Sequence, residues 1–165
     1  MIESNMFMVT HAAVGALVGG VVGSGPLAFT LGFISHFLMD MIPHGDEFMM
    51  DEYKSRNGSR VRKAVAYVTI DAIATIMAIL VMLSNAPAHM HDAMKWGIIG
   101  GVLPDLMVGI YEATKLKILR AYSAWHHRNH HHIIGKYRHG RDIPFKWGVA
   151  YQVVAAILLL KIAVV

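Results

Sequence analysis

Histidine and aspartate stand at metal-ligand spacing in the segment His36-Phe-Leu-Met-Asp40. Positions i and i+4 lie on one face of a helix. An imidazole and a carboxylate at this spacing can bind one metal ion, or the aspartate can orient the histidine as a ligand. A His–Asp pair that only holds two helices together is the alternative. His44 continues the same face, although Pro43 is expected to end the helix. His11 is either a further ligand facing this pair or an interfacial histidine.

Three other acidic residues are candidates for the same site. Asp105 follows the segment 100–104, Gly-Gly-Val-Leu-Pro, which is expected to interrupt a helix and to expose the carboxylate to a polar cavity. Asp105 is then a metal ligand or a hydrogen-bonded residue at a kink. Asp71 stands alone in an apolar stretch and is a candidate catalytic residue, metal ligand, ligand-orienting group or helix-packing residue. Glu112 is a candidate catalytic base or a simple interfacial charge.

Five of the seven residues from His126 to His132 are histidines. Neutral imidazole is the commonest metal ligand in proteins, but five neighbouring histidines cannot all bind one ion. We expect one or two of them to be ligands, with His127, His131 and His132 as the candidates, and the others to be exposed or to contact phosphate. The basic residues around the cluster either bind a phosphate substrate or only set the topology.

The composition indicates what kind of fold positions these residues. Of the 165 residues, 55% are hydrophobic and 16% are charged, whereas soluble domains have about 45–50% apolar and about 25% charged residues. Disordered, fibrous and multi-domain proteins do not fit this length and composition. The absence of cysteine excludes disulfides and thiolate metal sites. We therefore expect one membrane-embedded helical domain over residues 1–165.

Long apolar stretches predict the membrane spans. No Asp, Glu, Lys or Arg occurs between Glu3 and Asp40, a stretch too long for one span of about 20 residues. The turn signal Gly23-Ser24-Gly25-Pro26 divides it in two. We expect an all-α integral membrane protein, a compact bundle of about five transmembrane helices. The spans cover roughly residues 6–22, 26–42, 63–84, 95–113 and 145–164.

The basic residues predict the orientation in the membrane. Thirteen of the 15 Lys and Arg residues belong to the N-terminal side, to the loops 43–62 and 114–144, or to their flanks. The positive-inside rule then places the N-terminus and both long loops in the cytoplasm, and with them the candidate site. We expect a prokaryotic cytoplasmic membrane, with the lipid bilayer as partner. Nucleic acid is not an expected partner, because aromatic residues are not interleaved with the basic ones.

Several short segments together resemble the motifs of a known family, the membrane-bound metal-dependent hydrolases. This family is distantly similar to zinc-dependent phospholipase C and to the related single-strand nucleases. The segments are Thr10-His11, Ser35-His36-Phe-Leu-Met-Asp40-Met-Ile-Pro43, Leu103-Pro104-Asp105, and His127-Arg128 followed by His132.

The resemblance covers most of the chain and implies zinc or another divalent ion, with two or three ions at most and with iron or manganese also open. The implied ligands are His11, His36, Asp40, Asp105 and one of the loop histidines. The implied reaction is hydrolysis of a phosphoester, of which a phospholipid head group is one candidate. Such ions lower the pKa of a bound water and stabilise charge on a phosphoryl oxygen.

Three other functions stay open at this point. The segment His127-Arg-Asn-His130-His131 fits the HxxHH box of di-iron membrane oxidases and hydroxylases. Asp71 and Asp105, both within expected spans, would also fit a metal or proton transporter. Finally, the order of the motifs differs from the family pattern, which leaves a hydrolase-like protein with a purely structural metal.

Overall fold

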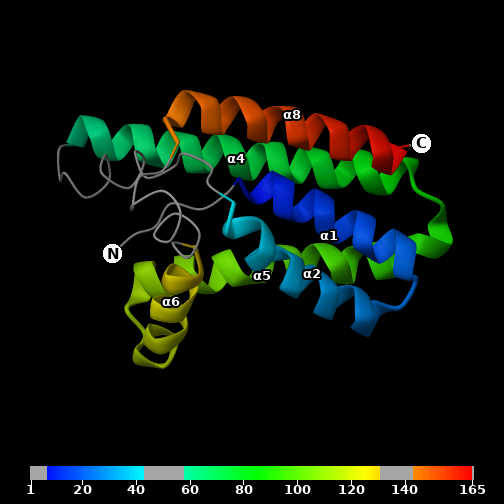
Figure 1. Ribbon diagram of the computed structural model, residues 1–165, viewed down its shortest axis with the longest axis horizontal. Coiled ribbons are helices and arrows are strands. Elements are labelled where there is room, and N and C mark those ends of the chain that lie inside the picture. Colours follow the sequence, from blue (N-terminus) through cyan, green and yellow to red (C-terminus); the bar gives the residue numbers. More distant parts are fainter. Residues whose placement is uncertain (1–6, 43–57, 131–142, 165) are drawn as a thin grey trace.

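The described part of the chain is entirely helical. The computed structural model describes residues 7–42, 58–130 and 143–164 (Figure 1). These residues form six α-helices and one short 3-10 helix, with no strand among them. The helices are α1 (Met8–Val22), α2 (Gly25–Asp40), α4 (Gly58–Asn85), η1 (Ala88–Met90), α5 (His91–Thr114), α6 (Lys117–His130) and α8 (Phe145–Val164).

The turn between α1 and α2 lies where the sequence predicts it. Gly23 caps α1 with φ of 65°, in the left-handed region that glycine adopts without a steric penalty. Pro26 stands at the start of α2, where its missing N–H costs no helical hydrogen bond. The prediction that the first apolar stretch is two helices is confirmed.

Two local predictions are wrong. Pro104 does not break its helix, because α5 continues through it from His91 to Thr114; the carbonyl groups near a proline can find other partners in a packed bundle. The segment 114–144 is not a simple loop, because it contains α6 (Lys117–His130).

The helices form a bundle with α1 near its middle (Figure 1). On one side of α1 lie α2 and α5, and on the other lie α4 and α8, while α6 packs on α5 and α2 at one end. The α1–α2 turn and the α4–α5 connection lie at the opposite end, together with the end of α8. Both connections are short, so α1 and α2 are antiparallel, as are α4 and α5.

Glycine lets α1 and α5 pack backbone to backbone. A Cβ atom at Gly97 would lie 2.0 Å from the carbonyl oxygen of Gly15, and one at Gly15 would lie 2.2 Å from the carbonyl oxygen of Gly97. Farther along α5, a Cβ atom at Gly101 would lie 2.6 Å from the carbonyl oxygen of His11. Small residues of this kind permit close helix contact in membrane bundles. The contact fixes α1 against α5 beside His11.

Of the five expected spans, two lie in described segments that are long and apolar enough to cross a membrane, Val65–Asn85 and Ala88–Thr114, so five transmembrane helices are not shown. Met8–Val22 and Lys146–Leu159 are apolar but shorter, and α2 has 16 residues. The two long segments differ in how much of each is buried. Within an apolar stretch of 18 residues, 17% is buried in Val65–Asn85 and 56% in Ala88–Thr114. Most of the α4 segment is therefore on the surface of the bundle, whereas more than half of the α5 segment is buried.

Candidate metal centre

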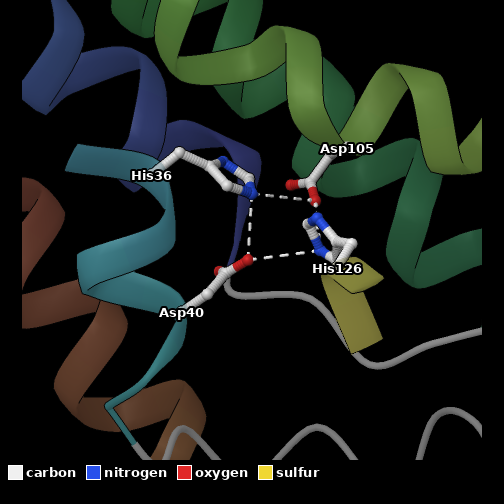
Figure 2. Close-up of side chains that lie close together, drawn as sticks. All are labelled: His36, Asp40, Asp105 and His126. Carbon is white, nitrogen blue, oxygen red and sulfur yellow. Dashed lines mark ion pairs between the residues drawn. The ribbon is translucent and has the colours of Figure 1, made fainter. Parts of the chain in front are cut away.

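Four buried ionisable side chains meet near the end of α2 (Figure 2). His36 and Asp40 come from α2, Asp105 comes from α5, and His126 comes from α6. Each residue offers one donor atom, and the four atoms all lie within 4.8 Å of one another. None of the four residues is more than 5% exposed. The residues are therefore close enough to hold a metal ion, and they also form ion pairs with one another.

The distances between these donor atoms suit a small divalent ion. The Nε2 atom of His36 lies 2.9 Å from Asp40 Oδ2 and 3.5 Å from Asp105 Oδ1. The Nε2 atom of His126 lies 3.3 Å and 3.7 Å from the same two oxygens. Four donors arranged tetrahedrally at zinc-ligand distances are about 3.3 Å apart. The four measured separations bracket that value.

The atoms at these short distances are buried inside the protein. Within the described helices, the Nε2 atom of His36 and both carboxylate oxygens of Asp40 are buried without a hydrogen bond of good geometry. Burying such groups without hydrogen bonds is unfavourable. A cation held between the four donor atoms would satisfy these buried groups.

A backbone carbonyl fixes the tautomer of His36. The Nδ1 atom of His36 lies 2.8 Å from the carbonyl oxygen of Gly101. A carbonyl oxygen only accepts hydrogen bonds, so Nδ1 carries the proton and donates a hydrogen bond to the carbonyl oxygen of Gly101. The lone pair of a neutral ring is then on Nε2, the atom that faces Asp40 and Asp105. Metal-binding histidines are commonly oriented in this way.

Helix α6 is docked onto α2 by the residues around His126. Asn129 donates from Nδ2 to the carbonyl oxygen of Phe37 at 3.0 Å, and the rings of Trp125 and Phe37 are 4.6 Å apart. Burial lowers the pKa of His126 to about 4, against the opposing negative charge of Asp40. His126 is therefore neutral at pH 7, the form that binds metal.

His11 stands at the edge of this group. Its Nε2 atom lies 3.0 Å from Asp40 Oδ1, and its ring stacks on that of His36 with 4.0 Å between centroids. Asp40 thus presents one oxygen to His11 and the other to His36 and His126. The structure brings together four of the predicted ligands: His11, His36, Asp40 and Asp105.

Asp71, a residue of α4, contacts the start of α1 and is not part of the four-residue cluster. Its carboxylate accepts the backbone N–H groups of Met8 at 2.7 Å and of Val9 at 3.3 Å. The side chain of Gln152 accepts the N–H of Phe7 at 2.6 Å. These bonds satisfy donors that every helix N-terminus leaves free. Asp71 therefore helps to hold the start of α1 in place, and α1 is the helix that carries His11.

Among the described residues, Glu112 and His127 are two predicted site residues that are not part of the four-residue group. Glu112 lies two helical turns beyond Asp105 on α5 and forms an ion pair with Lys115. His127 is half-buried on α6, with its ring centroid 6.5 Å from that of His126. His44, His131 and His132 lie outside the described residues.

Sequence reasoning missed His126 as a ligand because the histidine cluster was read as a loop. The available signal is the helical period within α6. Ser123 and His126 are buried three positions apart, and Tyr122 lies one turn before His126 on the same side. A helix ending in the cluster would have pointed His126 inward and its neighbours outward.

Comparison of the chain with protein-family models, with curated proteins and with solved structures gave no match.

Proposed function

We propose that the protein is a metal-dependent membrane hydrolase that acts on phosphoesters. The observation that carries the proposal is the four-donor cluster, with N···O separations between 2.9 and 3.7 Å in a site closed to solvent. When bound there, a divalent ion such as zinc would lower the pKa of a water molecule and offset charge on a phosphoryl oxygen.

The protein groups prepare this site in three ways. Gly101 holds His36 in the tautomer whose Nε2 faces the carboxylates. Burial keeps His126 neutral near pH 7. The two carboxylates, Asp40 and Asp105, supply the negative charge that attracts and holds a divalent cation. A fifth donor, His11, at the second oxygen of Asp40 gives room for more than one ion.

A membrane setting is supported by the surface of α4. Ile70, Ile73, Ile76 and Leu80 are each more than half exposed, and the helix is long enough to span. Exposed apolar surface on this scale marks a membrane or partner contact. In the proposed arrangement α1, α2, α4, α5 and α8 are the five spans, and the N-terminus and long loops are cytoplasmic.

The position of the cluster suits a phosphate group at the membrane surface. The cluster includes His126 of α6, and α6 lies at the end of the bundle opposite the α1–α2 turn (Figure 1). Helix α6 carries Lys117, Arg120 and Arg128. Basic residues at this end would attract an anionic head group, so the proposed substrate class is a phosphoester, with phospholipid as the candidate.

Metal analysis of detergent-purified protein tests the proposal. Wild-type protein is expected to bind zinc or another divalent metal stoichiometrically and to hydrolyse bis(p-nitrophenyl) phosphate, and His36→Ala and Asp40→Ala are expected to lose both properties. His89→Ala is the matched control, because His89 is exposed on η1 at the other end of the bundle. Wild type without bound metal would refute the site, whereas iron with oxygen-dependent activity would favour the di-iron alternative.

A further inference from the structure

A tyrosine beside the cluster has a hydroxyl group with no hydrogen-bond partner among the described residues. Tyr122 lies on α6, one helical turn before His126, and the two ring centroids are 6.1 Å apart. The side-chain oxygen is buried and makes no hydrogen bond anywhere in the described part of the chain. Buried hydroxyl groups normally have a partner, so this one is available to a molecule that enters the site.

The chemistry of the hydroxyl determines which kind of ligand it can serve. A tyrosine phenol has a pKa of about 10, so it is protonated at neutral pH. A neutral O–H group in a site of this kind is a hydrogen-bond donor for an anionic oxygen.

We infer that Tyr122 is a substrate-binding residue, whose hydroxyl donates a hydrogen bond to a phosphoryl oxygen held at the four-donor cluster. The inference rests on the proposed function, because the cation supplies the charge that brings the anion between Asp40 and Asp105. His126 and Tyr122 then act from one helix, the first as ligand to the cation and the second as donor to the anion. No bond is formed or broken by Tyr122 in this role.

His126 and Tyr122 both lie on α6, so one helix can carry the cation ligand and the hydrogen-bond donor. Residues i and i+4 project from the same face, and α6 is fixed on α2 through Asn129 and Trp125. The Tyr122 ring is 6.1 Å from the Trp125 ring, so packing limits its movement. A donor held in place binds its anion with a smaller loss of side-chain freedom.

Binding of inorganic phosphate to zinc-loaded protein tests the inference. Tyr122→Phe is expected to keep the wild-type zinc content and melting temperature, because the hydroxyl has no partner to lose, and to weaken phosphate binding at least about tenfold, as expected for a hydrogen bond to a charged group. Tyr111→Phe is the matched control; Tyr111 lies on α5 and its ring faces Lys115.

The outcomes separate this inference from the proposed function. Phosphate binding by Tyr122→Phe at wild-type strength would overturn the role of Tyr122 and leave the metal centre standing. Loss of zinc in this variant would also overturn it, because Tyr122 would then be a structural residue. Zinc-loaded wild type that does not bind phosphate would overturn the anion site, and wild type that binds no metal would refute the proposed function itself.

Discussion

Helices α1, α2 and α5 touch through their backbones, whereas α4 and α8 cover α1 with side chains and leave much of their own apolar surface exposed. In the first group a Cβ atom at Gly97 has no room beside Gly15. In the second group Ile76 of α4 is 59% exposed and Ile157 of α8 is 51% exposed. The donor cluster takes three of its four residues from the tightly packed group and none from α4 or α8.

This difference shows which helices must be positioned precisely. Ligand atoms must be held within about 0.5 Å of their productive positions, and backbone contact between helices gives little freedom to move. An outer helix that faces lipid needs only length and apolar side chains. The two groups of helices therefore have different tolerances to substitution, and three variants test that contrast.

The largest effect is expected at the α1–α5 contact. Gly97→Ala places a methyl group 2.0 Å from a backbone oxygen, so the helices must separate. We expect a loss of about 3 kcal/mol or more in unfolding free energy, measured by denaturation in detergent and followed by circular dichroism. Gly109→Ala on the same helix meets nothing within 4 Å and should stabilise the helix by about 0.5–1 kcal/mol. Equal effects at the two positions would refute the close-packing argument.

The next effect tests whether the exposed face of α4 contacts lipid. Ile76→Lys puts a charge at the middle of the segment Val65–Asn85. Insertion of this segment is expected to become less favourable by about 2.5–3.5 kcal/mol, measured as the inserted fraction in a translocon assay. Val65→Lys at the end of the segment is the control, because lysine there can extend to the interface. If both variants insert like wild type, α4 does not span the membrane in the proposed way.

A smaller effect is expected at the residue that joins the two groups of helices. Asp71→Ala removes the acceptor for the first N–H groups of α1 and should cost about 1–2 kcal/mol. Because α1 carries His11, metal affinity should also fall, which titration of the purified protein with zinc would detect. Asp92→Ala at the start of α5 is the control, since Asp92 is exposed and its ion pair with Lys95 contributes little. If Asp71→Ala keeps the wild-type metal affinity, the hydrogen bonds of Asp71 to the start of α1 do not influence the metal site.

Much of the helical layout could be predicted from where charges are absent. The turn at Gly23 and Pro26 and the helix-face spacing of His36 and Asp40 are local properties, and the structure shows both. Both of these predictions needed only short-range periodicity. Asp105 is also predicted as a residue of the same site, and the structure places its Oδ1 atom 3.5 Å from Nε2 of His36.

The remainder depended on tertiary contacts that spacing does not encode. Nothing in the sequence alone shows that α5 continues through Pro104, since the bundle decides whether the freed carbonyl finds a partner. Whether His126 or His127 faces the cluster depends on the orientation of α6 about its own axis. The hydrogen bond from Asn129 to the carbonyl oxygen of Phe37 fixes that orientation. Asp71 looked like a site residue because an isolated acid in an apolar stretch has the same appearance whether it binds a ligand or caps a helix.

The four donors of the cluster come from α2, which is far in the chain from α5 and α6, so an unassembled bundle offers no equivalent site. An ion bound there would act as a non-covalent cross-link between these helices. Its binding free energy would add to the stability of the folded state and raise the melting temperature as free metal increases. A chelator would remove that cross-link and weaken the attachment of α6, which rests on α5 and α2. The supply of metal would thereby affect how firmly α6 is held against the rest of the bundle.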